Sequence, residues 1–233
     1  MVSPETFLSG GRCKHVAEAW GVTQIELQEC ACTICGEIVS LRRETGAQGT
    51  SVALDGRPAG PVADLVQRCP FCGYCAPGLG GVRGLGHEPL SAFVHGPIYQ
   101  GQLHNAHLSQ EANTNLCWAL LCRHARQYEE AGRAALRAAW LSDDDGREEA
   151  AQWCRERALD MFLQAPSTLE LQMLQVDLLR RSGRFEGART HCQKLLKSKL
   201  NPGQTRVLKQ QLELIARGDS GGGLPGPGPR KRL

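Results

Sequence analysis

The sequence predicts an α+β protein in which a small β module with a four-cysteine metal site is followed by an all-α domain of helical hairpins. Three observations lead to this expectation. Two Cys-x-x-Cys-Gly segments lie in the first hundred residues, short alternating segments flank them, and the later chain is rich in Ala, Leu, Arg, Glu and Gln with helical periodicity. We expect a metal module with a glycine-rich connector over 1–100, a helical domain over 101–217, and a disordered Gly/Pro tail over 218–233.

The two cysteine pairs are Cys32/Cys35 and Cys69/Cys72, and a glycine follows each pair. Two intervening residues let the chain turn so that both sulfurs of a pair lie about 2.3 Å from one Zn²⁺. The glycine allows the positive φ that such a turn needs. The spacing therefore predicts four thiolates on one structural Zn²⁺, and disulfides or unligated thiols are the alternative.

Other cysteines and histidines offer competing ligands. Cys30 and Cys75 flank the pairs, and their spacing would also allow them to bind the metal. The two pairs that are followed by glycine are the better candidates. Cys13 and His15 form half a site that nothing nearby completes. A second metal site is an alternative for the histidines, but a role in a linker or on the surface is the simpler interpretation; they are His87, His95, His104 and His107.

Alternating segments over 23–28 and 38–42 predict strands entering and leaving the first pair, and 62–67 leads into the second. Short strands that feed two cysteine knuckles are the arrangement of a zinc ribbon. Such a module has a small apolar core, whereas a structural Zn²⁺ contributes about 10–16 kcal/mol of apparent binding free energy. We therefore expect that removing zinc unfolds this part of the chain.

The later chain predicts six helices, at roughly 110–125, 127–142, 146–164, 167–182, 185–198 and 203–217. A glycine followed five residues later by an alanine occurs at Gly183 and Ala188, and again at Gly146 and Ala151. This offset is typical of tetratricopeptide repeats, so we interpret the domain as tetratricopeptide-like, with a plain helical bundle as the alternative.

The composition argues against several classes of function. Residues 1–100 contain 7 Lys/Arg and 9 Asp/Glu, and this acidic balance argues against a nucleic-acid-binding module. The sequence has no signal-peptide pattern and no apolar run of membrane-spanning length. In the reducing cytoplasm, which we expect to be its location, paired cysteines more often hold metal than form disulfides.

The glycine-rich segment 77–86 lacks the Gly-Lys-Ser/Thr ending of a phosphate-binding loop, and we expect a flexible connector there.

Three segments resemble the bacterial domain of unknown function 2225 family. They are 65–74 (Leu-Val-Gln-Arg-Cys-Pro-Phe-Cys-Gly-Tyr), 138–141 (Ala-Ala-Trp-Leu) with the acidic turn after it, and 178–188. The resemblance implies a zinc-ribbon-like segment with four cysteine ligands and a tetratricopeptide-like region. Cys75 departs from the family, which usually has a small residue there. The family has no established activity, so the resemblance implies none.

We therefore expect a non-enzymatic, zinc-binding adaptor that binds a protein or peptide through its helices, because no catalytic Ser/His/Asp or Cys/His/Asn pattern is present. The alternatives are an electron-transfer protein that holds iron like a rubredoxin, which the Cys-Pro-x-Cys-Gly segment resembles, and a zinc-ribbon regulator that binds nucleic acid.

Overall fold

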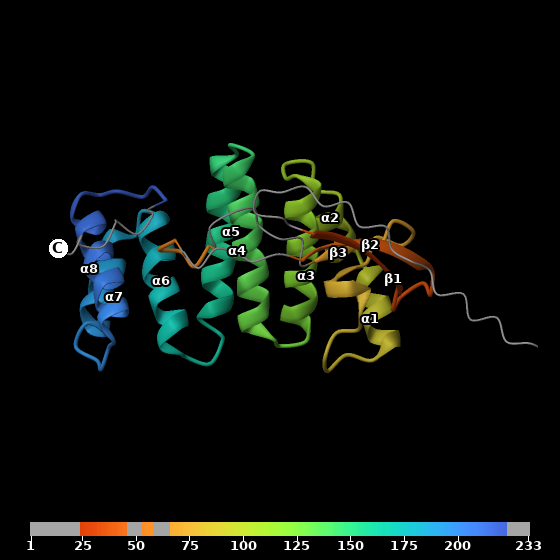
Figure 1. Cartoon of the computed structure of the whole chain (residues 1–233), viewed down its shortest axis with the longest axis horizontal. Coiled ribbons are helices and arrows are strands. Elements are labelled where there is room, and N and C mark those ends of the chain that lie inside the picture. The colour runs from red at the N-terminus through yellow and green to blue at the C-terminus, as the bar shows by residue number, and fades with distance from the viewer. Residues whose placement is uncertain (1–23, 46–52, 58–65, 223–233) are drawn as a thin grey trace, which may run out of the picture.

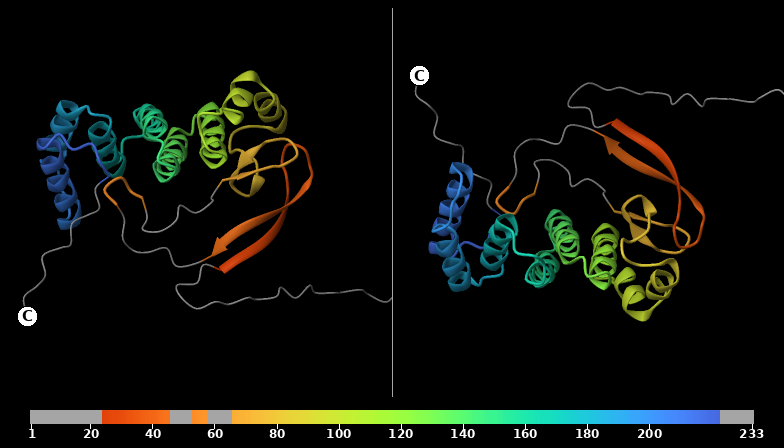
Figure 2. Two further views of the ribbon diagram at one scale, coloured as in Figure 1. Left: turned by 90° about the horizontal axis from the view of Figure 1, so that it is seen from above. Right: turned by 90° about the horizontal axis from the view of Figure 1, so that it is seen from below.

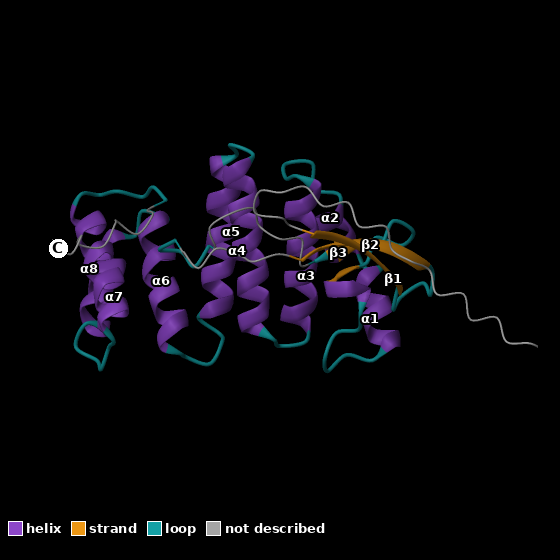
Figure 3. Cartoon of the chain, viewed as in Figure 1, coloured by secondary structure: helices purple, strands orange, loops and turns teal. Residues whose placement is uncertain are grey.

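The computed structural model describes residues 24–45, 53–57 and 66–222, and shows eight helices and two small β hairpins there. The helices follow one another along the long axis of the molecule, with the hairpins at the N-terminal end (Figure 1; Figure 3). Their bounds are α1 His87–Val94, α2 Pro97–Leu103, α3 Gln110–His124, α4 Tyr128–Asp144, α5 Glu148–Phe162, α6 Leu169–Arg181, α7 Phe185–Leu195 and α8 Pro202–Ala216. Cys13, His15 and the start of the expected segment 62–67 lie outside the described residues.

Each β hairpin carries one cysteine pair at its closed end. Strand β1 (Gln24–Ala31) pairs antiparallel with β2 (Ile38–Thr45), and the first pair lies in the connection between them. Strand β3 (Gln67–Arg68) pairs in the same way with β4 (Cys75–Ala76) around the second pair. The strands expected at 23–28 and 38–42 are thus confirmed over 24–28 and 38–42, as parts of longer strands; residue 23 lies outside the described residues.

The six helices expected from the sequence form as α3 to α8, with ends within three residues of the expected positions. Local side-chain capping explains where several of these helices begin. The side chains of Ser109 and Thr168 accept hydrogen bonds from backbone N–H groups in the first turns of α3 and α6. Asn201 and Gln204 form a reciprocal capping box at the start of α8. These polar residues stand where the apolar periodicity begins, so local capping agrees with the helix starts that the periodicity predicted.

Three connections between consecutive helices share one geometry. A residue with positive φ ends each first helix: Arg126 (φ 57°), Gly146 (φ 67°) and Gly183 (φ 71°). The next residue donates its N–H to a carbonyl five positions earlier, at 2.8 Å in all three connections. The alanine five positions after the positive-φ residue is fully buried each time, as Ala131, Ala151 and Ala188. The connections are unevenly spaced along the chain, so the helices do not form units of one length.

The core consists of two clusters. The larger one runs from the cysteine-bearing hairpins through α1 to α6, and the smaller one joins α6, α7 and α8. The cysteines of the helical part lie inside these clusters as small apolar groups, as expected; they are Cys117, Cys122, Cys154 and Cys192.

Helices α1 and α2 were not expected. They have only 8 and 7 residues, which is too short for a clear helical periodicity in the sequence. Their N-cap positions are occupied by Gly86 and Gly96, which make no side-chain capping bond. The segment 77–86, expected as a flexible connector, buries Leu79 and Val82 in the larger core cluster. It therefore packs as part of the module that contains the cysteines.

The start of the C-terminal tail is held by a buried arginine. Arg180 of α6 is fully buried and donates hydrogen bonds to the backbone carbonyls of Asp219 (2.6 Å) and Gly221 (2.8 Å). Of the segment expected to be disordered, residues 218–222 are therefore ordered, and 223–233 lie outside the described residues. In the described part of the chain, no helix has the length and apolarity needed to cross a membrane.

A close approach between α4 and α5 gives a test of this packing. A Cβ on Gly132 would lie 2.4 Å from Cε1 of the buried Phe162. The Gly132→Ala variant should therefore lower the free energy of unfolding, because overpacking costs about 1–3 kcal/mol or more. That cost outweighs the helix propensity that alanine gains, about 1 kcal/mol.

Gly187→Ala is the matched control. Gly187 is an exposed residue of α7 whose added Cβ would meet only Leu179 Cδ2, at 3.9 Å. This variant should be as stable as the wild type or more so in thermal unfolding followed by circular dichroism. A Gly132→Ala protein with the wild-type melting temperature would contradict the packing described here.

Candidate metal centre

The two cysteine pairs form turns with the same backbone pattern. In the first, Cys32 donates its N–H to the carbonyl of Glu37 (2.9 Å), and Gly36 donates its N–H to the carbonyl of Cys32 (2.8 Å). In the second, the same bonds join Cys69 to Tyr74 (2.8 Å) and Gly73 to Cys69 (3.0 Å). Gly36 and Gly73 both have φ of +75°. The glycines thus have the role that the sequence predicted.

The turns bring four sulfurs to one point. Cys32 Sγ lies 3.7 Å from Cys72 Sγ, and Cys35 Sγ lies 3.7 Å from Cys69 Sγ. All four Sγ atoms lie within 4.8 Å of one another. Four sulfurs bound tetrahedrally at about 2.3 Å from a Zn²⁺ would be about 3.8 Å apart. The arrangement is therefore one that can hold a metal ion.

Backbone N–H groups point at three of these sulfurs, those of Cys32, Cys69 and Cys72; burial outweighs the effect at Cys72 and raises the pKa of its thiol. Burial raises the pKa of the Cys32 thiol, and hydrogen bonds from the N–H groups of Cys35 and Ile34 oppose that rise. Burial acts in the same sense on Cys69, but hydrogen bonds from the N–H groups of Cys72 and Phe71, together with those from the Cys35 and Cys72 side chains, hold the pKa of Cys69 below its usual value. Such hydrogen bonds favour the thiolate, which is the form that binds metal.

The second turn is anchored on the helices. Tyr99 of α2 is fully buried and accepts a hydrogen bond from the N–H of Cys75 (2.9 Å) while its hydroxyl donates to the carbonyl of Gly73 (3.2 Å). Tyr74, also fully buried, donates to the carbonyl of Gly80 (2.6 Å). The second cysteine pair is consequently part of the main core.

The first turn reaches the rest of the molecule through fewer contacts. Thr33 donates its N–H to the carbonyl of Leu79 (3.1 Å), and an exposed contact of 3.4 Å joins His87 Nε2 to the carbonyl of Ile34. The side chains at the far end of this hairpin include Leu27, which is 71% exposed. A shared metal ion would therefore be a major connection between the first hairpin and the helices.

The competing ligands are not brought together. Cys30 and Cys75 are outside the four-sulfur group, and Cys75 donates its thiol to the carbonyl of Gly73 (3.3 Å). His95 and His104 are exposed, and the Nδ1 atom of each lies near a carbonyl of its own helix. Within the described residues, the four cysteines are the only group of three or more His, Cys, Asp or Glu side chains close enough to share an ion.

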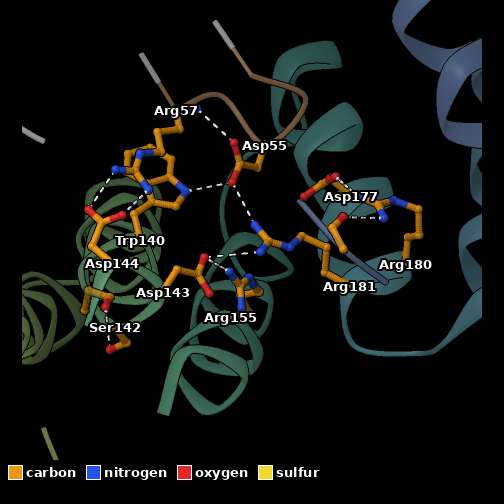
Figure 4. Close-up of polar contacts among 12 residues, drawn as sticks. Asp55, Arg57, Trp140, Ser142, Asp143, Asp144, Arg155, Asp177, Arg180 and Arg181 are labelled. Atoms are coloured by element: carbon orange, nitrogen blue, oxygen red, sulfur yellow. Dashed lines mark hydrogen bonds and ion pairs between the residues drawn. The ribbon is translucent and has the colours of Figure 1, made fainter. Parts of the chain in front are cut away.

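The structure also assigns contacts to residues for which the sequence predicted no role. Residues 53–57 belong to the segment between the two cysteine pairs, and they lie against α4 and α6, where Asp55 contacts Trp140 and Arg181 (Figure 4). The Asp-Gly sequence at 55–56 is typical of a turn. No local pattern indicates partners 85 and 126 residues away, so sequence reasoning could not find them.

Comparison of the chain with protein-family models, curated proteins and solved structures finds no significant match. The resemblance to the domain of unknown function 2225 family therefore depends on the quoted segments alone and stays an expectation.

The four-sulfur group predicts one bound ion per chain. We expect purified protein to be colourless and to contain one Zn²⁺ by elemental analysis, and Cys32→Ser or Cys72→Ser to lose it together with β-hairpin structure, because three thiolates bind more weakly than four. Cys30→Ser is the matched control, since Cys30 lies nearby but outside the group. Equal zinc content in all of these variants would show that the ion is not held here.

The two knuckle glycines predict unequal effects. Both have positive φ, but a Cβ on Gly73 would lie 2.5 Å from Leu103 Cδ2, whereas nothing lies within 4 Å of a Cβ on Gly36. Gly36→Ala should cost about 1–2 kcal/mol, the backbone cost of a left-handed residue. Gly73→Ala should cost more, because a clash with α2 is added. Chelator competition and chemical unfolding measure both effects, and equal losses would contradict the prediction.

Proposed function

We propose that this chain is a non-enzymatic, zinc-binding adaptor that binds a protein partner through its helical part, and that it acts in the cytoplasm. The observation that carries the proposal is the completeness of the four-sulfur group. Catalytic zinc sites normally have three protein ligands and one open position for water or substrate, whereas four thiolates fill a tetrahedral site. An ion held by Cys32, Cys35, Cys69 and Cys72 would have a structural role.

The helical part supports the adaptor role. Helical hairpins whose turns share one geometry, each followed by a fully buried alanine, are typical of tetratricopeptide-like domains. We interpret α3–α7 in this way, and a plain bundle is the alternative because the turns are unevenly spaced. Stacked helical hairpins present long surfaces that proteins use for binding other proteins. Two cavities of about 440 Å³ and 760 Å³ lie along these helices.

Iron-based electron transfer is the first rival. Two knuckles with hydrogen bonds to sulfur also suit an iron–thiolate centre. Such a centre is red, whereas a zinc–thiolate centre is colourless, so elemental analysis and visible absorption distinguish iron from zinc. The large aromatic residue of the second knuckle, Phe71, is 64% exposed. A rubredoxin-like module would need a compact aromatic core around its iron; here Tyr74 and Tyr99 are buried beside the second knuckle but Phe71 is not, and we take the incomplete aromatic packing to favour zinc.

Nucleic-acid binding is the second rival. The acidic balance of residues 1–100 opposes it, because phosphate recognition needs a basic surface. A salt-dependent mobility shift with DNA or RNA would favour this rival over the adaptor.

Cross-linking tests the adaptor proposal. Full-length protein is expressed in its native host, cross-linked and purified, and the cross-linked peptides are identified by mass spectrometry. We expect a reproducible protein partner whose cross-links map to α3–α8. Cross-links confined to the β hairpins, or no partner together with turnover of a metabolite, would overturn the proposal.

A further inference from the structure

Residues 53–57, which we call the strap, form a small closed turn. Ala53 donates its N–H to the carbonyl of Arg57 (2.8 Å), and Gly56 donates to the carbonyl of Ala53 (3.0 Å). The N–H of Arg57 also donates to Asp55 Oδ1 (3.1 Å), and Gly56 has φ of +80°. The strap therefore keeps its shape through its own hydrogen bonds. In the sequence it lies between the cysteine pairs, yet in space it sits beside α6, on the same side of the helices as the β1–β2 hairpin (Figure 2).

The carboxylate of the strap has two partners on the helices. Asp55 Oδ2 accepts a hydrogen bond from Nε1 of Trp140 in α4 (2.9 Å) and forms an ion pair with Arg181 of α6 (2.9 Å). The side chains of Asp55 and Arg181 are each only 10% exposed. Charge-assisted hydrogen bonds of this kind are stronger than neutral ones, and burial increases their strength.

The other strap residues fit the same surface. Arg57 forms two parallel hydrogen bonds to the carboxylate of Asp144 (2.9 and 2.7 Å; Figure 4). Leu54 is buried. A Cβ on Gly56 would lie 3.1 Å from Leu174 Cδ2, so a side chain there would strain both backbone and packing. The surface thus recognises an apolar residue, a carboxylate, a glycine and a guanidinium in consecutive positions.

The receiving surface has its own charge balance. Asp143 pairs with Arg155 and with Arg181 (3.2 Å). Together with Asp144, these residues supply two negative and two positive charges before the strap is counted. The strap adds one of each sign, with its aspartate facing Arg181 and its arginine facing Asp144. The surface is therefore complementary to a turn that carries both signs, and not to a purely acidic or basic segment.

The receiving surface could make further contacts with a ligand. The buried Nε atoms of Arg155 and Arg181 lack a hydrogen-bond partner among the described residues. Next to the strap, a cavity of about 440 Å³ extends between α4, α6 and α8, with apolar walls that include Leu136, Met173 and Val207. A ligand longer than the strap could fill this cavity, whereas the strap only borders it.

We propose that the strap is a built-in occupant of a peptide-binding site, and that the partner presents a turn of the Leu-Asp-Gly-Arg type to Trp140, Asp144, Leu174 and Arg181. This inference rests on the adaptor function proposed above and specifies the partner's chemistry. A strap tethered in the same chain acts at an effective concentration in the millimolar range, so it competes with the partner's turn. The partner gains its advantage by extending into the cavity.

A labelled peptide tests the proposal. The probe covers residues 51–60 of this chain and is cyclised through added terminal cysteines, because a preorganised turn loses less entropy on binding. The receptor is the full-length protein in which residues 53–57 are replaced by Gly-Ser-Gly-Ser-Gly. We expect this receptor to bind the probe at least about tenfold more tightly than the wild type does, since the wild-type strap competes. Fluorescence anisotropy measures both affinities.

Matched variants show whether the named contacts are responsible. In the strap-replaced receptor, Arg181→Ala or Trp140→Phe should weaken binding about tenfold or more, and a probe with Asp55→Asn and Arg57→Ala should bind neither receptor. Asp55→Asn in the full-length protein weakens the strap without replacing it and should give an intermediate affinity. Zinc content and circular dichroism establish that each receptor is folded.

A folded, strap-replaced receptor that fails to bind the probe, or that binds both probes equally, would show that the strap is only a structural tie and would overturn the inference. Failure of the adaptor proposal has a different signature. In that case the cross-linking experiment yields no partner, whatever the peptide affinity.

Discussion

The convergence of the four sulfurs is the constraint on which the N-terminal part of the molecule depends. Strands β1 and β2 form a two-stranded ribbon, and an isolated ribbon of this kind is at best marginally stable in water. Its side chains give little help, since Leu27 and Ile38 are exposed and only Val39 is buried among the ribbon residues whose side chains are described. A metal ion shared with the second knuckle would supply the missing stabilisation, because its binding free energy would exceed what so small an apolar surface can contribute.

The two knuckles have the same backbone but different surroundings, and this difference gives each a separate role. The second knuckle is embedded in the core, where Tyr99 and Leu103 hold it against α2 and α3. The first is more exposed: Cys32 is buried in the same core cluster and Ile34 packs against it, but Cys35 and Gly36 are exposed. A metal ion bound by all four cysteines would tie the more exposed knuckle to the anchored one. The helical part continues this core without a break from α3 to α6.

The features that the sequence predicted well are those encoded by short-range patterns. Ligand spacing and knuckle glycines identified the four cysteines, and periodicity interrupted by helix breakers such as Gly183 and Pro202 identified the longer helices. Helices α1 and α2 were not predicted because they are short and begin after glycines that provide no side-chain cap, although Pro97 at the first position of α2 is a local helix-start signal. The burial of Leu79 and the contacts of Asp55 were beyond reach for another reason. Both depend on partners distant in the sequence, and no local pattern records which helix a loop will meet.

The position of the strap between the two cysteine pairs has a thermodynamic consequence. A docked strap fixes one point of the chain between the two cysteine pairs, which lowers the entropy that is lost when the four cysteines meet, so docking and metal binding would favour each other. Linkage requires this coupling to be reciprocal. A ligand that displaces the strap would consequently lower the affinity of the four cysteines for a metal ion, and loss of that ion would increase the fraction of chains in which the strap is not docked. The fraction of chains with metal at the four cysteines would thus depend on whether the strap or another ligand occupies the surface of α4 and α6.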